Sequence, residues 1–133
     1  MTALDVVTRR REELVDVTAR VQQAVREAGV REGICLVASP HTTCGVTVNE
    51  GFDPAVASDA VGHLRAVVPQ DGGFAHAEGN SDSHIKTMLV GTSAALPVAG
   101  GQLVLGRWQA VFLCEFDGPR DRELWVTVVG PGR

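Results

Sequence analysis

The sequence predicts a single α+β domain built on a largely antiparallel β-sheet or sandwich, with two main helices and one short helix. Strand-like segments group at the C-terminal end and helices are interleaved early, an order more typical of α+β folds than of doubly wound α/β folds. The chain has 133 residues, the length of one ordinary domain, and contains neither an internal repeat nor a linker. We therefore treat residues 1–133 as one domain.

The N-terminal segment is predicted to form a strand followed by a helix. The strand covers Ala3–Val7, and the basic run Arg9–Arg11, which two glutamates follow, is interpreted as the solvated end of that strand. Valine and alanine then recur at helical spacing, which predicts a helix over Asp16–Ala28. Asp16 is the expected N-cap and Gly29 the expected terminator.

Two further strands and a second helix are predicted in the middle of the chain. Ile34–Ala38 is a continuous apolar run, Cys44–Asn49 alternates apolar and polar side chains, and a polar break separates the two. Asp53 is a typical N-cap and is followed by proline at the first helical position, so a helix is expected from there up to Pro69.

A long loop and a short third helix come next. Gln70–Asn80 has no periodicity and is predicted to be a loop. Ser81 or Asp82 can cap a helix that Gly91 ends. The side chains expected to point inward from this helix are those of Ile85, Met88 and Leu89.

The remaining apolar segments predict the C-terminal strands. They cover Leu96–Val98, Leu103–Phe116 and Glu123–Val129, and a turn at Asp117–Arg120 joins the last two. Trp108 and Trp125 lie in these strands and are expected to be packing residues.

Composition and charge exclude several classes of partner. The chain has 12 basic and 16 acidic residues, and its net charge of −4 provides no field that would attract nucleic acid. The N-terminus lacks the apolar segment of a secretion signal, and no stretch is long enough to cross a membrane. Cys35, Cys44 and Cys114 lack C-x-x-C spacing and are expected to be unpaired, with Cys35 and Cys114 buried. These features predict a cytoplasmic protein.

Two familiar phosphate-binding motifs are absent, and polar residues gather in three clusters instead. The sequence contains neither G-x-x-x-x-G-K-[ST] nor a G-x-G-x-x-G segment after a strand, which argues against nucleoside triphosphatases and dinucleotide-dependent enzymes. The first cluster is His41, Thr42 and Thr43, between two predicted strands. It continues along one face of the second strand to Asn49 and Glu50.

The second cluster follows the long loop and enters the short helix. It consists of His76, Glu78, Asn80, Asp82, His84 and Lys86. Histidine and carboxylate side chains in such positions are typical of divalent-metal sites and of acid–base pairs. The spacing between His76 and His84 is not that of a known zinc motif. From this spacing alone, His76 is expected to be a solvent-exposed loop residue and His84 a residue on the helix surface. His63, in the middle of the second helix, belongs to no cluster.

The third cluster surrounds the long predicted strand. Arg107, Gln109 and Glu115 share one face of it, and Arg120 follows in the turn. Glu115 and Arg120 can belong to a surface salt-bridge group worth under about 1 kcal/mol. Alternatively, Arg107, Arg120 and Lys86 are the cationic donors that a phosphate requires.

The segments that contain these clusters resemble the signature blocks of the YjbQ-like family. The blocks are Pro40–Glu50, Glu78–Lys86, Leu105–Gln109 and Glu115–Arg120. Their order and spacing match over nearly the whole chain, so the resemblance is specific. Arg107 is a departure, because the family usually has threonine at this position of an L-G-T-W-Q block.

The resemblance implies a secondary thiamine-phosphate synthase. Such a transferase joins hydroxymethylpyrimidine diphosphate, a small phosphorylated substrate, to a thiazole phosphate and releases pyrophosphate. It needs a metal or cations on the leaving phosphates. The resemblance also implies a homotrimer with histidines near the subunit boundaries.

The clusters supply candidates for each role in this site. Catalytic candidates are His41, His76, His84 and Glu50, and metal ligands are expected from His41, His76, His84 and Asp82. Substrate-binding candidates are Thr42, Thr43, Asn49, Lys86, Gln109 and Arg120. Histidine ligands favour zinc or another transition metal, and magnesium bound with the diphosphate is the alternative. Two other functions stay open: a metal-dependent hydrolase using the same histidines, and a non-catalytic oligomer that binds metal or an anionic metabolite.

Overall fold

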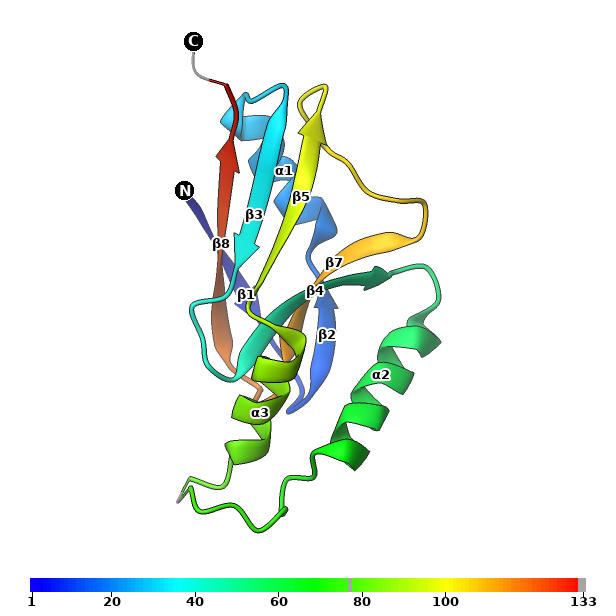
Figure 1. Ribbon diagram of the computed structural model, residues 1–133, viewed down its shortest axis with the longest axis vertical. Coiled ribbons are helices and arrows are strands. Elements are labelled where there is room, and N and C mark those ends of the chain that lie inside the picture. Colours follow the sequence, from blue (N-terminus) through cyan, green and yellow to red (C-terminus); the bar gives the residue numbers. More distant parts are fainter. Residues whose placement is uncertain (77, 132–133) are drawn as a thin grey trace.

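The computed structural model describes residues 1–76 and 78–131, in which two antiparallel sheets and three helices form the fold (Figure 1). The larger sheet has the strand order β1-β8-β3-β5-β6. These strands are β1 (Thr2–Val7), β8 (Asp121–Val129), β3 (Gly33–Ala38), β5 (Ser93–Ala99) and β6 (Gln102–Leu103). The smaller sheet consists of β2 (Glu13–Asp16), β7 (Gln109–Glu115) and β4 (Cys44–Glu50), in that order. The predicted α+β class with a largely antiparallel sheet is confirmed.

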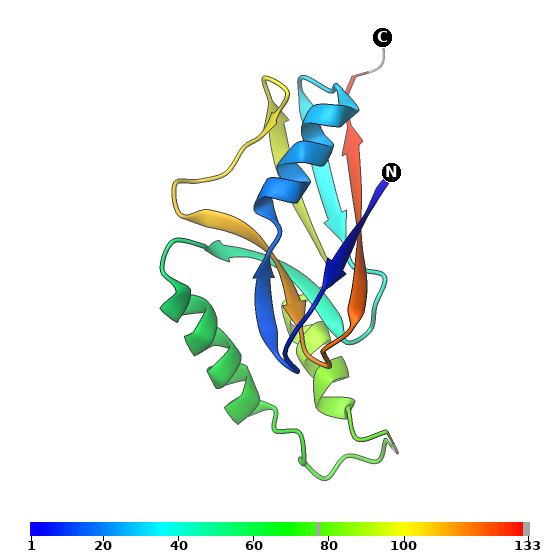
Figure 2. The same cartoon turned by 180° about the vertical axis from the view of Figure 1, so that it is seen from behind.

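Helix α1 (Thr18–Ala28) covers one face of the larger sheet, as the two opposite views show (Figures 1 and 2). Its buried residues, Val21, Ala24 and Val25, pack in the main core with apolar side chains of β3, β5 and β8. The opposite face of this sheet has no helix over it in the described part of the chain (Figure 1). On that face Ile34 and Leu36 are exposed.

Strand β7 is buried on both faces, because the smaller sheet lies between two apolar layers. Val111 and Leu113 face the main core. Ala110, Phe112 and Cys114 form a second core with Phe116, and side chains of α2 (Pro54–Val67) and α3 (Ser81–Val90) pack against it. The smaller sheet thereby fixes the positions of α2 and α3.

The first two helices begin close to where the sequence predicts. Asp53 caps α2: its Oδ1 accepts a hydrogen bond from the Ala55 N–H at 2.9 Å. Helix α1 starts at Thr18, two residues later than predicted, because Asp16 ends strand β2 and its Oδ1 accepts from the Thr18 N–H. Strand β2 is too short to show apolar alternation, and the sequence did not predict it.

The orientation predicted for α3 is wrong. Met88 is 83% exposed and Leu89 is 62% exposed, whereas Asp82, Ser83, Lys86 and Thr87 are buried. The helix therefore turns its polar face inward. The physical reason is that this face meets charged partners from the N-terminal segment, described below.

The long strand predicted over Leu103–Phe116 is divided between the two sheets. Its ends form β6 and β7, and a turn closed by a hydrogen bond from the Gln109 N–H to the Gly106 carbonyl lies just before β7. Trp108 lies in that turn and is 48% exposed, and Trp125 is 37% exposed on β8. The prediction that both are packing residues of the core is wrong, because each lies at the surface with more than a third of its area exposed.

The cysteines behave as predicted. All three are free and buried. Burial raises the pKa of Cys35 to about 11 and the pKa of Cys44 and Cys114 to about 12. Among the described residues, no helix has the length and apolar character needed to span a membrane.

Candidate functional site

A buried ionic network links α3 to the segment before β2. The Lys86 Nζ lies 2.7 Å from Asp82 Oδ2 and 2.8 Å from Glu12 Oε2, and Lys86 is 0% exposed. Arg11 binds the two oxygens of Asp82 at 3.1 and 3.2 Å, and Arg65 Nε donates to Glu12 Oε1 at 3.0 Å. Two carboxylates and three cations therefore form one connected network with an excess of one positive charge. The interpretation of Arg9–Arg11 as the solvated end of a strand is wrong for Arg11, which is partly buried and bound to Asp82.

The network fixes the ionisation of Asp82. Burial by itself raises the pKa of this carboxyl group, but hydrogen bonds and charges from Arg11 and Lys86 outweigh burial and lower the pKa below its ordinary value. Asp82 and Lys86 are both fully buried and paired with one another. Their arrangement is that of a structural ion pair.

A second buried pair lies at the base of the His41 loop. Arg122 on β8 forms a two-oxygen contact with Glu115 on β7, and Thr8 donates to Glu115 Oε1 at 2.6 Å. The Arg122 guanidinium also donates to the hydroxyl of Thr43 at 2.9 Å. Thr43 is thus buried, and its hydroxyl accepts a hydrogen bond from Arg122. This contact links the residue before β4 to β8.

His41 lies in the loop between β3 and β4 and is held by backbone contacts. The ring Nε2 of His41 accepts a hydrogen bond from the backbone N–H of Glu123 at 2.9 Å. The backbone N–H of His41 donates to Ser39 Oγ. Burial lowers the pKa of His41, and the positive charge of Arg122 lowers it further. His41 is therefore neutral at pH 7. Since Nε2 accepts, the ring proton is on Nδ1.

His41 lines a pocket with the exposed side of α3. The pocket has a volume of about 520 Å³ and is lined by His41, Thr42, His84, Thr87, Met88, Gly91 and Thr92. A close approach between β4 and the end of α3 sets its floor: the Val46 N–H donates to the Gly91 carbonyl at 3.0 Å. A Cβ atom on Gly45 would lie 2.6 Å from the same oxygen, so only glycine fits there.

His76 and His84 contact one another directly. Their ring centroids are 5.6 Å apart and the rings are perpendicular. His76 Nε2 also lies 3.7 Å from the carboxylate of Glu78. His84 thus contacts His76 and lines the same pocket as His41. Among the described residues of this chain, no group of three or more histidine, cysteine or carboxylate side chains is arranged to hold a metal ion.

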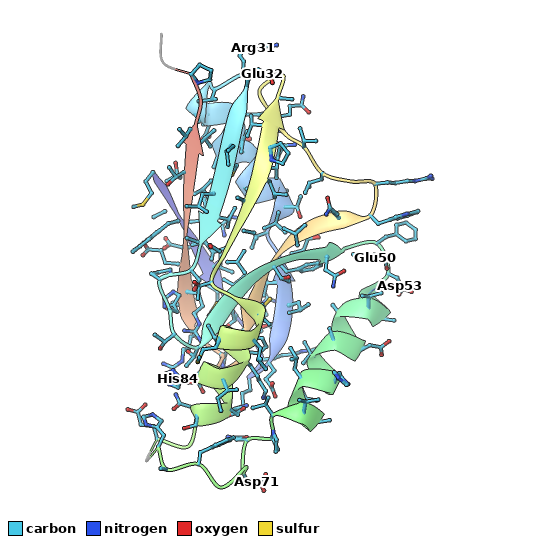
Figure 3. The ribbon with its side chains drawn as sticks, in the orientation of Figure 1. Arg31, Glu32, Glu50, Asp53, Asp71 and His84 are labelled. Carbon is cyan, nitrogen blue, oxygen red and sulfur yellow. The ribbon has the colours of Figure 1, made fainter. Side chains whose placement is uncertain are left out.

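Other predicted site residues lie elsewhere. Glu50 and Gln109 pair with each other at the far end of β4 and β7, and Figure 3 shows Glu50 well away from His84. Asn49 is exposed beside Glu50, and its Oδ1 accepts from the Glu50 N–H. Arg120 is bound to Asp117 at 3.0 Å. None of these four residues lines the His41 pocket.

Sequence reasoning missed several residues of this region. Arg122 lies on the same side of β8 as the buried residues Leu124 and Val126. Their spacing of two residues was the signal that could have identified an arginine facing the interior. Thr92 follows the glycine that ends α3, where no sequence pattern distinguishes a pocket residue from a loop residue. Glu12 gave no signal, because it is one of several charged residues in a row.

Comparisons with known proteins identify the family. The family model described as UPF0047 protein YjbQ-like matches residues 2–131. A UPF0047 protein of Methanocaldococcus jannaschii is 46% identical over 123 residues, which cover 92% of this chain and 89% of that protein. The UPF0047 protein YugU of Bacillus subtilis is 38% identical over 131 residues, or 98% of this chain and 99% of YugU.

Solved structures agree with these sequence matches. A crystal structure of a YjbQ/UPF0047 family protein from Clostridium acetobutylicum superposes with a TM-score of 0.95 at 41% identity, covering 97% of this chain and 100% of the other. A conserved hypothetical protein from Thermus thermophilus superposes with a TM-score of 0.90 at 44% identity, covering 97% of this chain and 100% of the other. The chain therefore belongs to the UPF0047, or YjbQ-like, family.

Proposed function

We propose that the chain is an enzyme acting on a small phosphorylated substrate, with the pocket between His41 and His84 as its reaction centre. The supporting observation is the pocket itself, which places two histidines and three threonines around about 520 Å³. That volume is in the range of sites for small metabolites, roughly 300–1,000 Å³. A few convergent polar groups in an otherwise apolar lining are typical of such sites.

His41 suits the role of a hydrogen-bond donor to phosphate. It is neutral, its Nε2 already accepts from the Glu123 N–H, and so Nδ1–H is its remaining donor. Neutral donors that are fixed before the substrate arrives stabilise negative charge that develops in the transition state. Lys86 and Arg120, the cations that the sequence offered for this purpose, are engaged with carboxylates.

The reaction we propose is the thiamine-phosphate synthase reaction that the family resemblance implies. The thiazole nitrogen attacks the methylene carbon of hydroxymethylpyrimidine diphosphate, the carbon–oxygen bond to the diphosphate breaks, and pyrophosphate leaves with the bonding electrons. Donors such as His41 Nδ1–H would stabilise the leaving oxygens, and a pocket that excludes water would protect the electron-poor carbon.

A divalent metal is part of this proposal, in one of two forms. The perpendicular contact between His76 and His84 leaves two imidazoles able to bind one zinc or other transition metal, with further ligands from the substrate or a second copy of the chain. His41 does not fit as a ligand in this arrangement, because Nδ1 carries its proton. Asp82 does not fit either, because it is buried in ion pairs. Alternatively, magnesium arrives bound to the diphosphate.

The histidine pair also favours a second candidate, a metal-dependent hydrolase. A metal on His76 and His84 would lower the pKa of a bound water toward neutrality and supply a nucleophile next to the same pocket. This activity would release phosphate or pyrophosphate without forming a new carbon–nitrogen bond.

We also propose that the chain assembles as a homotrimer, as the resemblance implies. The sheet face opposite α1 supports self-association, because Ile34 is 58% exposed, Leu36 42%, Trp125 37% and Val129 63%. Ile34 pairs with Val129, and Trp125 lies opposite Ala38, so these side chains form a continuous surface. A contiguous apolar surface of this kind is typical of contacts between protein chains.

The test is product analysis with purified protein. Hydroxymethylpyrimidine diphosphate and thiazole phosphate are supplied with magnesium or zinc, and thiamine phosphate and pyrophosphate are measured. We expect both products in equal amounts, and we expect His84→Ala to abolish them. The exposed His63 on α2 provides the matched control, His63→Ala, which keeps full activity.

Other outcomes separate the candidates. Release of phosphate or pyrophosphate without thiamine phosphate, lost in both His76→Ala and His84→Ala, favours the hydrolase. Binding of metal or pyrophosphate without turnover under any metal leaves a non-catalytic binding protein and overturns both enzyme proposals.

A further inference from the structure

A second pocket lies where β4 ends and α2 begins, away from His84 (Figure 3). It has a volume of about 390 Å³ and is lined by Glu50, Phe52, Asp53, Pro54 and Trp108. Phe52 is 77% exposed and Trp108 is 48% exposed, and their ring centroids are 5.2 Å apart in an edge-to-face contact. Two large aromatic side chains exposed side by side are unfavourable in water unless a ligand or partner uses them.

Backbone contacts join the two segments that carry the rings. The Gly51 N–H donates to the Trp108 carbonyl at 2.9 Å, which joins the segment before Phe52 to the turn before β7. A Cβ atom on Gly51 would lie 2.4 Å from the Cβ of Ala110, so the two segments are as close as glycine allows. Gln109 Oε1 accepts from the Gly106 N–H at 2.8 Å and closes the turn. The backbone positions of Phe52 and Trp108 are therefore fixed relative to one another before a ligand binds.

The charge at this pocket is negative and unpaired. Neither Glu50 nor Asp53 forms an ion pair with any residue in the described ranges. One oxygen of Asp53 caps α2, which leaves the other free. Figure 3 shows Glu50 and Asp53 together at this junction.

Trp108 already contacts one cation. The guanidinium carbon of Arg107 lies 4.8 Å from the centroid of the Trp108 ring. This distance is within the range of cation–π contacts, roughly 6 Å or less. The Trp108 ring thus already takes part in a cation–π contact, in which Arg107 occupies one face of the indole.

We propose that this pocket binds a small arylalkyl-ammonium cation, in which a short alkyl chain joins an aromatic ring to an ammonium group. The aromatic part of the ligand packs against Phe52 and Trp108, and its ammonium group binds the carboxylates of Glu50 and Asp53. Stacked on the indole, Arg107 repels and competes with such a ligand, so its loss strengthens binding. This site is separate from the reaction proposed at His41, and its failure would leave that proposal unchanged.

Three probes with the same ring and different charges test the proposal: benzylammonium, benzyl alcohol and benzoate. The sequence contains two tryptophans and no tyrosine, so the variant Trp125→Phe leaves Trp108 as the sole source of indole fluorescence. We expect saturable quenching by benzylammonium at millimolar concentration, with binding at least about tenfold tighter than that of benzyl alcohol or benzoate.

Variants in this background identify the residues involved. Glu50→Gln and Asp53→Asn each remove one charge, and asparagine preserves the helix cap; each is expected to weaken benzylammonium binding by about threefold to fivefold. Phe52→Ala is expected to weaken it by about fivefold or more. Arg107→Thr is expected to strengthen it. The matched control is Asp59→Asn, which removes an exposed charge elsewhere on α2 and is expected to change nothing.

Several results would overturn the proposal. Equal or tighter binding of benzyl alcohol or benzoate would show that the carboxylates do not select a cation. An equal loss of binding in Asp59→Asn would show a diffuse charge effect. A smaller native mass of Phe52→Ala in sedimentation would show that the aromatic pair is covered by a second copy of the chain, and thermal melting of every variant verifies that it folds.

Discussion

At the scale of single residues, Lys86 is the side chain with the most unusual environment. It is fully buried, and two carboxylates lie within 2.8 Å of its Nζ. Taking an ammonium group out of water costs several kcal/mol, and that cost is offset only where the partners are close and well oriented. The fold therefore depends on the complete set of charges, and any one member is costly to remove.

Replacement of Lys86 by methionine tests this dependence. The variant Lys86→Met keeps the bulk of the stem but leaves Asp82 and Glu12 buried with fewer cations, so we expect the free energy of unfolding to fall by about 3–5 kcal/mol. Urea denaturation followed by circular dichroism measures the loss. As a control, Arg120→Met breaks a half-exposed pair with Asp117 and is expected to cost under about 1 kcal/mol. Equal losses in the two variants would contradict the special role of Lys86.

His41 provides a pH-dependent prediction. Because its pKa is lowered in the folded chain, the unfolded chain takes up a proton at higher pH than the folded chain does. The contribution of His41 to stability is therefore present above its ordinary pKa of 6.5 and is lost as the pH falls through the lowered value. We expect the melting temperature to fall between about pH 7.5 and about pH 5, and to fall less in His41→Asn. His63→Asn is the control and is expected to keep the same fall in melting temperature as the unchanged protein. If His63→Asn reduces that fall as much as His41→Asn does, the pH dependence does not come from His41.

At the scale of helices and strands, α2 and α3 show two different relations between sequence and structure. Helix α2 has a local start signal at Asp53 and Pro54, and the structure reproduces it. Helix α3 has a periodic pattern that identifies which residues share a face, but the pattern cannot say that the polar face is the buried one. That depends on Arg11 and Glu12, about seventy positions away in the sequence.

Substitutions at Asp53 measure how much the N-cap of α2 contributes to the stability of the protein. Val61 is the buried residue of this helix, so tertiary packing contributes little and the cap matters more. We expect Asp53→Ala to lower the free energy of unfolding by about 1 kcal/mol and Asp53→Asn to lower it by a few tenths at most. Asp59→Ala, in the exposed middle of the same helix, is expected to have little effect. A loss in Asp53→Asn as large as in Asp53→Ala would show that charge, rather than the cap hydrogen bond, stabilises the helix start.

At the scale of the whole molecule, the sequence predicted the class of fold and part of the site. Strand positions and the second helix follow from local patterns, whereas the division of one predicted strand between two sheets depends on the turn at Gly106–Gln109. Within the candidate site, His41, Thr42 and His84 line one pocket, whereas His76 does not line it. Glu50 ends strand β4, which begins at Cys44 just after Thr43, and a strand of seven residues holds its two ends too far apart for one site.

The uncovered face of the larger sheet gives a prediction about assembly. If this face contacts a second copy of the chain, Ile34→Glu places a charge in an apolar contact and should dissociate the assembly, which sedimentation measures as a lower native mass. Gln23→Glu adds the same charge on the exposed side of α1 and should leave the mass unchanged. An unchanged mass in Ile34→Glu would contradict assembly through this face.

The position of Lys86 has a consequence for covalent chemistry. It is the single lysine of residues 1–133 and it is fully buried, so the folded domain shields its side-chain amine from amine-reactive reagents. Such reagents should therefore leave Lys86 unmodified while the domain stays folded. Acylation at Lys86 requires the ionic network to open, and the rate of its appearance by mass spectrometry would report how often the molecule unfolds.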